Sequence, residues 1–74
     1  MRDKQLKFIE IAEKRVNRLL EEIRLVGNLS NRNNYSYEVD DVSKIFGAID
    51  AELRTAKKRF EIALASAERG FKLR

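Results

Sequence analysis

The first third of the chain carries apolar residues at alternating intervals of three and four positions. The repeat consists of Ile9, Ala12, Val16, Leu19, Ile23 and Val26. Residues spaced in this way lie on one face of an α-helix, as the a and d positions of a heptad repeat do. Leu6, Phe8 and Leu20 flank this face and widen it to the width typical of a core-facing helix. We therefore predict an amphipathic helix over about residues 3–27.

The same repeat returns in the second half of the chain and continues there without a fault. It consists of Val39, Val42, Phe46, Ile49, Leu53, Ala56, Phe60, Ala63, Ala67 and Gly70. Ser36 is a candidate N-cap residue, and Glu38, Asp40 and Asp41 place negative charge at the positive end of the helix dipole. No proline interrupts the repeat. We predict a second, longer helix over about residues 38–70.

The segment between the two repeats has a different composition, because it holds four of the five asparagines. Gly27 and Asn28 both tolerate a left-handed backbone, so we expect them to end the first helix. We predict a loop over about residues 28–37, in which asparagine side chains hydrogen-bond the backbone of the loop itself. The apolar residues expected to anchor this loop on the helix ends are Leu29, Tyr35 and Tyr37.

Two helices joined by such a loop predict an all-α fold, with one domain in the form of an antiparallel two-helix hairpin. At a rise of 1.5 Å per residue, the first helix spans roughly 36 Å and the second roughly 48 Å. The end of the second helix therefore lacks a partner within the hairpin. The candidate dimer-interface residues at this end are Leu64, Ala67, Phe71 and Leu73. We expect a second copy to cover them, which gives a homodimer with coiled-coil packing, a four-helix bundle.

The residue types that most enzymes use are missing from the chain. It contains no Cys and no His, so triads, thiol nucleophiles and the usual zinc and haem ligands are lost. The three glycines lie far apart and form no phosphate-binding loop. We expect no catalytic residue, no metal site and no cofactor, and hence a protein that is not an enzyme.

The hydrophobic pattern also bears on localisation. The N-terminal residues lack the apolar run of a signal peptide, and no stretch approaches the roughly 18 apolar residues of a membrane helix. We expect a cytoplasmic protein that does not contact a membrane.

The net charge of +4 leaves two interpretations of the basic residues open. A candidate nucleic-acid-binding patch in the middle of the hairpin consists of Lys14, Arg15, Arg18, Arg54, Lys57 and Lys58. The alternative is a set of solvated helix flanks with ordinary ion pairs, of Glu13 with Lys57, Asp50 with Arg54, and Glu61 with Lys57 or Lys58. A separate candidate is a partner-binding loop formed by Arg32, Tyr35 and Tyr37.

The string over residues 23–37, which reads IRLVGNLSNRNNYSY, and its continuation DVSKIF at residues 41–46 resemble a family of short helical proteins from bacterial mobile elements and phages. The resemblance covers roughly half of the chain. The family has no assigned activity, so no functional residue follows from it. It implies a bacterial accessory gene, where small helical proteins act as regulators, antitoxin-like partners or inhibitors.

Three functions follow from these observations. The first is a small non-enzymatic protein-interaction module that acts as a homodimeric helical hairpin. The second is a nucleic-acid-binding accessory or regulatory protein that uses the mid-hairpin basic patch. The third is a small protein inhibitor or antitoxin-like partner.

Overall fold

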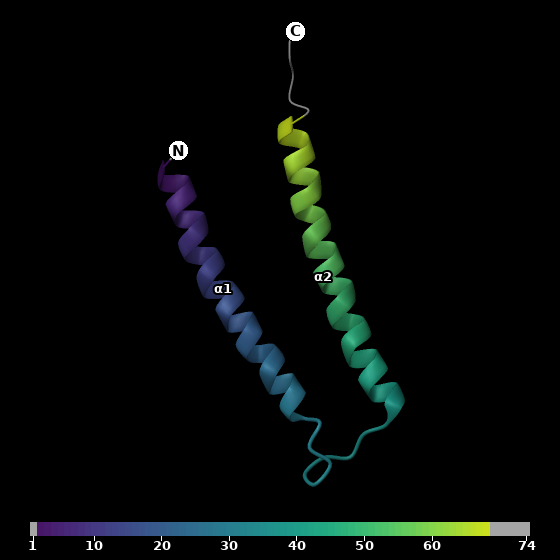
Figure 1. The fold of residues 1–74 in the computed structure, drawn as a ribbon. Coiled ribbons are helices and arrows are strands. Elements are labelled where there is room, and N and C mark those ends of the chain that lie inside the picture. Colours follow the sequence, from purple (N-terminus) through teal and green to yellow (C-terminus); the bar gives the residue numbers. More distant parts are fainter. Residues whose placement is uncertain (1, 69–74) are drawn as a thin grey trace. The chain divides into compact units, whose positions relative to one another are not determined.

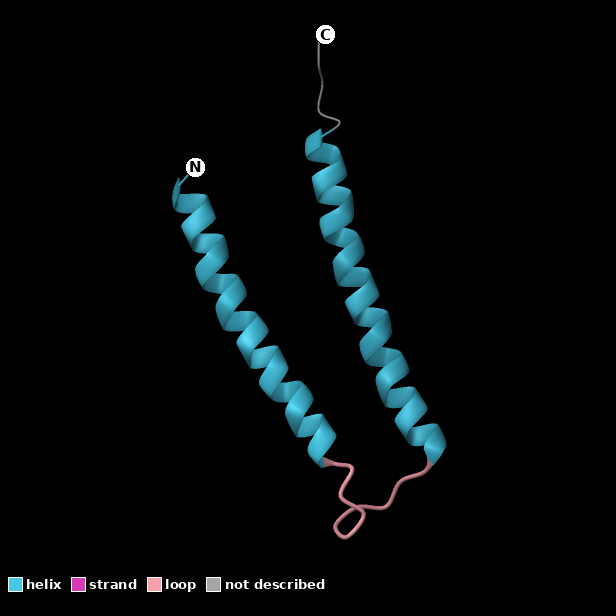
Figure 2. Ribbon diagram, in the orientation of Figure 1, coloured by secondary structure: helices cyan, strands magenta, loops and turns pink. Residues whose placement is uncertain are grey.

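A computed structural model of the chain describes residues 2–68, and these are helical apart from one connecting segment. Helix α1 comprises Arg2–Asn28 and helix α2 comprises Val39–Glu68 (Figure 1). Figure 2 shows helices and a loop but no strand within the described range. The predicted all-α class is thereby confirmed, with helix boundaries close to those predicted. The chain divides into two units, Met1–Ser36 and Tyr37–Arg74, each built on one helix.

At the C-terminal end of helix α1, the backbone hydrogen bonds change from a spacing of four residues to a spacing of three. The backbone N–H groups of residues 29, 30 and 31 each donate to a carbonyl three positions earlier: Leu29 to Val26 at 3.0 Å, Ser30 to Gly27 at 3.1 Å and Asn31 to Asn28 at 3.4 Å. These bonds satisfy carbonyls that have no partner four positions on. No residue in the range 2–68 has a positive φ. The predicted left-handed stop at Gly27 and Asn28 is therefore wrong, since both residues lie within α1.

The connecting segment is organised by Asn31. Its side-chain Oδ1 accepts a hydrogen bond from the N–H of Asn33 at 2.9 Å. Its backbone carbonyl accepts from the N–H of Asn34 at 3.1 Å and from that of Tyr35 at 3.0 Å. An asparagine that bonds the backbone two positions on closes a local turn. This confirms, for Asn31, the expected hydrogen bonding within the loop.

The side chain of Asp41 caps the N-terminal end of helix α2. The N–H of Glu38 donates to Oδ2 of Asp41 at 2.8 Å, and the carbonyl of Glu38 accepts from the N–H of Val42 at 3.3 Å. This is the return half of a capping box, with an aspartate in place of the usual glutamate. Glu38 is thus the N-cap residue, and the prediction of Ser36 is wrong, because Asp41 satisfies the N–H at the later position. The negative first turn is confirmed by Asp40 and Asp41.

None of the side chains of residues 3–66 is buried. On α1, Ile23 is 36% exposed and Val16 is 51% exposed. On α2, Leu53 is 43% exposed and Phe60 is 57% exposed. These residues belong to the predicted heptad repeats. Each helix, taken by itself, therefore presents an uncovered apolar face.

Candidate functional site

Each helix carries three of the six predicted basic-patch residues. On α1, Lys14, Arg15 and Arg18 are exposed and lie within about one turn of each other, because Arg18 follows the other two by four and three positions. On α2, Lys57 and Lys58 follow Arg54 by three and four positions, and all three are also exposed. Helical geometry thus brings the residues together as two local triplets. Their union in one patch belongs to the hypothesis of a paired hairpin.

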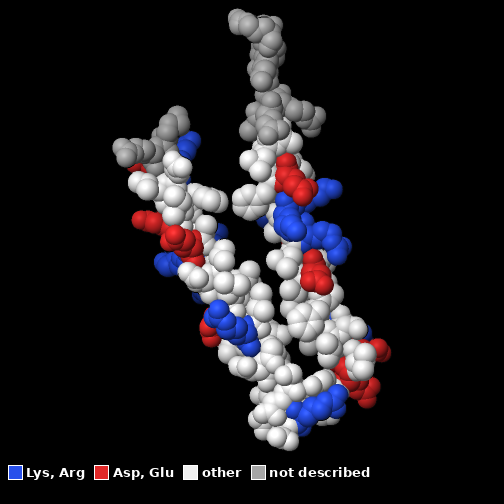
Figure 3. Space-filling view, in the orientation of Figure 1, with Lys and Arg blue, Asp and Glu red and all other residues white. Residues whose placement is uncertain are grey.

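Acidic side chains interrupt the positive charge on α2. Figure 3 shows basic side chains gathered midway along α2, with acidic ones on either side of them. The structure shows an ion pair between Arg24 and Glu21 on α1, with Nη1 and Oε1 3.0 Å apart. Within residues 2–68 it places no ion pair between Asp50 and Arg54, or between Glu61 and Lys57, which the sequence suggested. The helix flanks are therefore of mixed sign and open to solvent.

The predicted partner-binding loop is only partly accessible. Arg32 is exposed and lies in the turn that follows Asn31, while Tyr35 closes that turn with its N–H and is 49% exposed. Tyr37 is half-buried. Leu29, predicted as an anchor, is exposed as well. Arg32 and Tyr35 are therefore the members of this set that are exposed, and Tyr37 is the least accessible of the three.

The four predicted dimer-interface residues fall near the end of α2. Leu64 is 63% exposed, the highest value of the leucines on this helix. Ala67 lies in the last turn of α2. Phe71 and Leu73 lie outside the described residues. Of this set, Leu64 is therefore the residue whose exposure the structure establishes.

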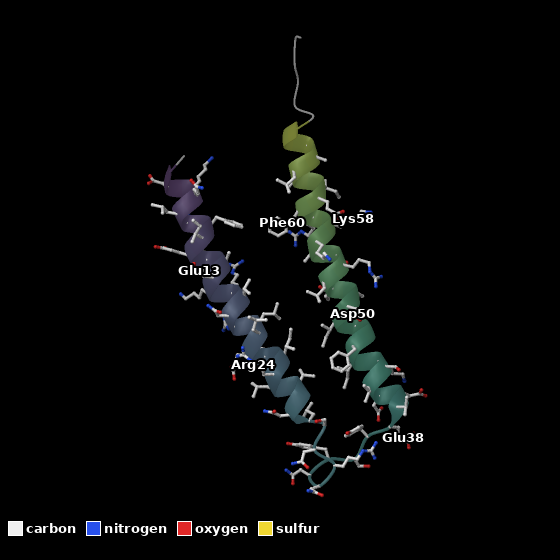
Figure 4. All side chains as sticks on the ribbon, in the orientation of Figure 1. Glu13, Arg24, Glu38, Asp50, Lys58 and Phe60 are labelled. Atoms are coloured by element: carbon white, nitrogen blue, oxygen red, sulfur yellow. The ribbon has the colours of Figure 1, made fainter. Side chains whose placement is uncertain are left out.

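An open hollow lies on the apolar face of α2. It is lined by Ala56, Arg59, Phe60 and Ala63. It forms because two alanines, spaced around a phenylalanine, leave room beside the aromatic ring. Figure 4 shows Phe60 and Lys58 on opposite sides of α2, as expected for residues on its apolar and solvated faces. An apolar side chain from another helix is the natural occupant of such a hollow.

Charged residues border this apolar face on both sides. With Leu53 at a heptad a position, the e positions hold Asp50 and Lys57, and the g positions hold Glu52 and Arg59. All four are exposed. The sequence patterns placed Lys57 in the candidate basic patch and paired Asp50 and Lys57 in ordinary ion pairs, but they gave no site role to Glu52 or Arg59. The signal that identifies them is the heptad register, because e and g residues flank the seam between paired helices.

The described residues contain no group of acidic side chains placed to hold a metal ion. Across residues 2–68, neither helix combines the length and the apolar character needed to cross a membrane. The chemistry that the structure does offer consists of two apolar helix faces with charged borders.

Comparison of the sequence with protein-family models, with curated proteins and with solved structures finds no match in any of the three. The resemblance to proteins of mobile elements thus stays a prediction.

Proposed function

We propose that this chain is a small, non-enzymatic protein-interaction module, and that it works as a homodimer of antiparallel helical hairpins. One observation carries the proposal: two long helices present heptad faces on which no large apolar residue is buried and most are exposed, with only Val26 and Ile49 half-buried. Most of the stability of a helix in a protein comes from packing of its apolar face. Burying one such side chain contributes about 1.5–3 kcal/mol. Both faces therefore need cover.

Antiparallel pairing within the chain is the first part of that cover. The connecting segment 29–38 is longer than a minimal hairpin loop, but it leaves the two helices consecutive in sequence and free to pack as antiparallel neighbours. Pairing of two helices still leaves the outer flanks of both apolar faces open. Phe8 on α1 and Ile45 on α2 lie at g positions on these flanks and are exposed. A second hairpin covers them in a four-helix bundle, the simplest closed assembly of two such units.

The outer surface of this bundle is where a different protein would bind. Ile11, Leu25 and Ile62 are exposed and lie off the heptad faces, so the bundle does not cover them. Tyr35 and Arg32 add an exposed aromatic and a positive charge at the loop. A regulator, an inhibitor or an antitoxin-like partner of a bacterial protein, acting in the cytoplasm, fits this surface and the resemblance noted in the sequence.

The two exposed basic triplets support nucleic-acid binding as a second candidate function. Pairing of the helices would bring Lys14, Arg15 and Arg18 to the same part of the hairpin as Arg54, Lys57 and Lys58. Phosphate contacts by such a surface are independent of base sequence, and their affinity falls steeply with salt. Because acidic side chains lie among the basic ones on α2, nucleic-acid binding is the second candidate and not the first.

Two measurements test the proposal. The mass in solution, from sedimentation equilibrium over a range of concentrations, is expected to correspond to two chains, with helical circular dichroism lost as the dimer dissociates. A mass of one chain with full helicity contradicts the homodimer. Capture from a bacterial lysate, with and without nuclease, then separates the two functions. A protein partner that survives nuclease supports the interaction module. Recovery of nucleic acid, lost when Arg54, Lys57 and Lys58 are replaced by Glu, supports the second function instead.

A further inference from the structure

The charged residues beside the apolar face of α2 change sign at one point along the helix, from acidic before it to basic after it. Asp50 and Glu52 precede a point between Arg54 and Thr55, and Lys57 and Arg59 follow it at matching distances. A second α2 laid antiparallel about this point therefore places acidic residues against basic ones. In antiparallel helix pairs, g residues face g residues and e residues face e residues across the seam. The symmetry of the sequence thus matches the symmetry of a two-fold axis.

We infer that α2 pairs with α2 of a second copy in a single antiparallel register, with the two-fold axis between Arg54 and Thr55. In this register Glu52 meets Arg59 of the partner subunit across the g flank, two positions from level, and the axis generates the same pair a second time. The e flank repeats the arrangement with Asp50 and Lys57, so the same register is favoured whichever flank faces the second copy. This inference rests on the proposed homodimer and specifies its interface.

The neighbouring registers are disfavoured by charge. A shift of one heptad in one direction brings Glu52 against Glu52 of the partner subunit, and Asp50 against Asp50 of the partner subunit. A shift in the other direction brings Arg59 against Arg59 of the partner subunit, and Lys57 against Lys57 of the partner subunit. Like charges at flanking positions suppress the wrong pairings, as in other coiled coils whose register is specified by charge. The inferred register alone brings opposite charges together on both flanks.

The apolar layers of the same register fit by size. Leu53 lies level with Ala56 of the partner subunit, Phe46 with Ala63 of the partner subunit, and Ile49 with Phe60 of the partner subunit. Each alanine thus faces a large side chain. The hollow lined by Ala56, Arg59, Phe60 and Ala63 receives those side chains. Alternation of large and small residues across a seam fills the core without voids.

Helix α1 shows the same device independently. Arg15 and Glu22 occupy g positions and are exposed. An antiparallel α1 pair with its axis between Asn17 and Arg18 brings them together across the g flank, two positions from level. A shift of one heptad brings Arg15 against Arg15 of the partner subunit, or Glu22 against Glu22 of the partner subunit. Both helices therefore point to a second copy of this chain as the partner.

The two axes become one in the four-helix bundle when the middle of α1 lies level with the middle of α2. In that bundle Ala12 lies level with Phe60, and Ile9 lies level with Ala63. The e residue Glu13 then faces Lys57, a pair that the sequence had suggested on its own. Such a bundle would bury all six members of the α1 repeat in layers with members of the α2 repeat.

The test uses charge reversal in the full-length chain. We expect Glu52→Arg and Arg59→Glu each to weaken self-association by about tenfold, because each replaces two attractive pairs with two repulsive ones. The double variant E52R/R59E restores all pairs with reversed sign, so it is expected to recover dimerisation. An equimolar mixture of the two single variants is expected to form a heterodimer tighter than either homodimer. Sedimentation equilibrium, with one variant carrying a mass tag, measures each dissociation constant.

Matched controls separate pairing from net charge. Lys58→Glu makes the same charge change as Arg59→Glu at a position on the solvated side of α2, and Glu61→Arg does the same for Glu52→Arg. Both controls are expected to leave the dissociation constant within about twofold of the unmodified chain. Equal effects of Lys58→Glu and Arg59→Glu would overturn the inferred register. Failure of the double variant to recover dimerisation would also overturn the inferred register. The proposed homodimer would stand in that case, because the unmodified chain would still dimerise. A one-chain mass for the unmodified protein defeats both proposals.

Discussion

Helices α1 and α2 carry the same heptad repeat but fill it with different residues. In α1 the repeat is almost entirely of branched aliphatic residues, with Ala12 as its one small member. In α2 the second half alternates large and small, as Leu53, Ala56, Phe60 and Ala63. The apolar face of α1 is therefore an even ridge, whereas that of α2 has a hollow beside Phe60. An even ridge packs in several registers, whereas an uneven one fits only where its small residues meet large ones. We infer that α2, more than α1, determines the register of the assembly.

The largest effect is expected from a charge placed in the apolar face of α2. Leu53→Asp puts a carboxylate in the layer that both proposed pairings bury, where an unpaired charge costs several kcal/mol. We expect loss of the dimer and of most helical circular dichroism. Ala51→Asp, on the opposite side of the same helix, is the matched control and is expected to retain both. Equal behaviour of the two variants would show that this face of α2 has no partner.

A change of side-chain size tests the unevenness itself. Ala56→Leu fills the hollow, so in the inferred register it crowds the large residue opposite and destabilises the dimer by about 1–3 kcal/mol. If the hollow faced solvent, the same change would replace alanine by a residue of only slightly lower helix propensity and would leave the stability almost unchanged. Thermal unfolding of Ala56→Leu, with Ala51→Leu as the control, shows whether the substitution lowers the stability of the protein. Unchanged or raised stability of Ala56→Leu would remove the size argument for the register.

The two helices also differ at their termini near the loop, since α2 begins with a side-chain cap and α1 ends without one. Asp41→Ala removes the acceptor of the Glu38 N–H and a negative charge from the first turn. We expect a loss of about 1 kcal/mol in the free energy of unfolding. Asp40→Ala keeps the hydrogen bond and loses only the charge, so a smaller loss is expected. Urea unfolding of both variants measures the difference, and equal losses would rule out the cap.

The smallest effect is expected at the end of α1. Gly27 has a helical backbone, and a Cβ added there meets nothing within 4 Å. Gly27→Ala is therefore expected to stabilise the protein by about 0.5–1 kcal/mol, through helix propensity and a less flexible unfolded chain. Gly47→Ala, within α2 and equally open, is the control for the size of this gain. A loss of stability at Gly27 alone would mean that the residue adopts a left-handed backbone in solution.

Periodicity alone predicted both helices, and it did so because side-chain spacing is a property of the chain itself. The apolar repeats placed α1 and α2 close to their observed boundaries. The asparagine-rich loop was also predicted, and Asn31 supplies the turn hydrogen bonds expected of it. Leu29 and Tyr35 were expected to anchor that loop, yet both are exposed. A composition rich in apolar residues indicates a tendency to pack, but it does not say which neighbour is near enough.

The helix ends show where sequence reasoning stops. Ser36 and Asp41 can both cap the start of α2, and only the structure shows that the side chain of Asp41 accepts the hydrogen bond from the N–H of Glu38. Gly27 can adopt either hand of backbone, and the structure places it inside α1. These choices turn on differences of about 1 kcal/mol between competing hydrogen bonds. The candidate site follows the same division. The charged residues of the candidate site and their spacing could be predicted from the sequence. The hollow that Arg59 and Phe60 line is visible only in the folded helix.

The sequence by itself determined the helical class, the two apolar faces and the positions of the charges beside them, because each of these follows from residue type and a period of 3.6. Only the three-dimensional structure decided which atoms end each helix and where the surface of α2 is hollow. Those features depend on which groups meet in space, and several arrangements of nearly equal free energy are open to the same residues.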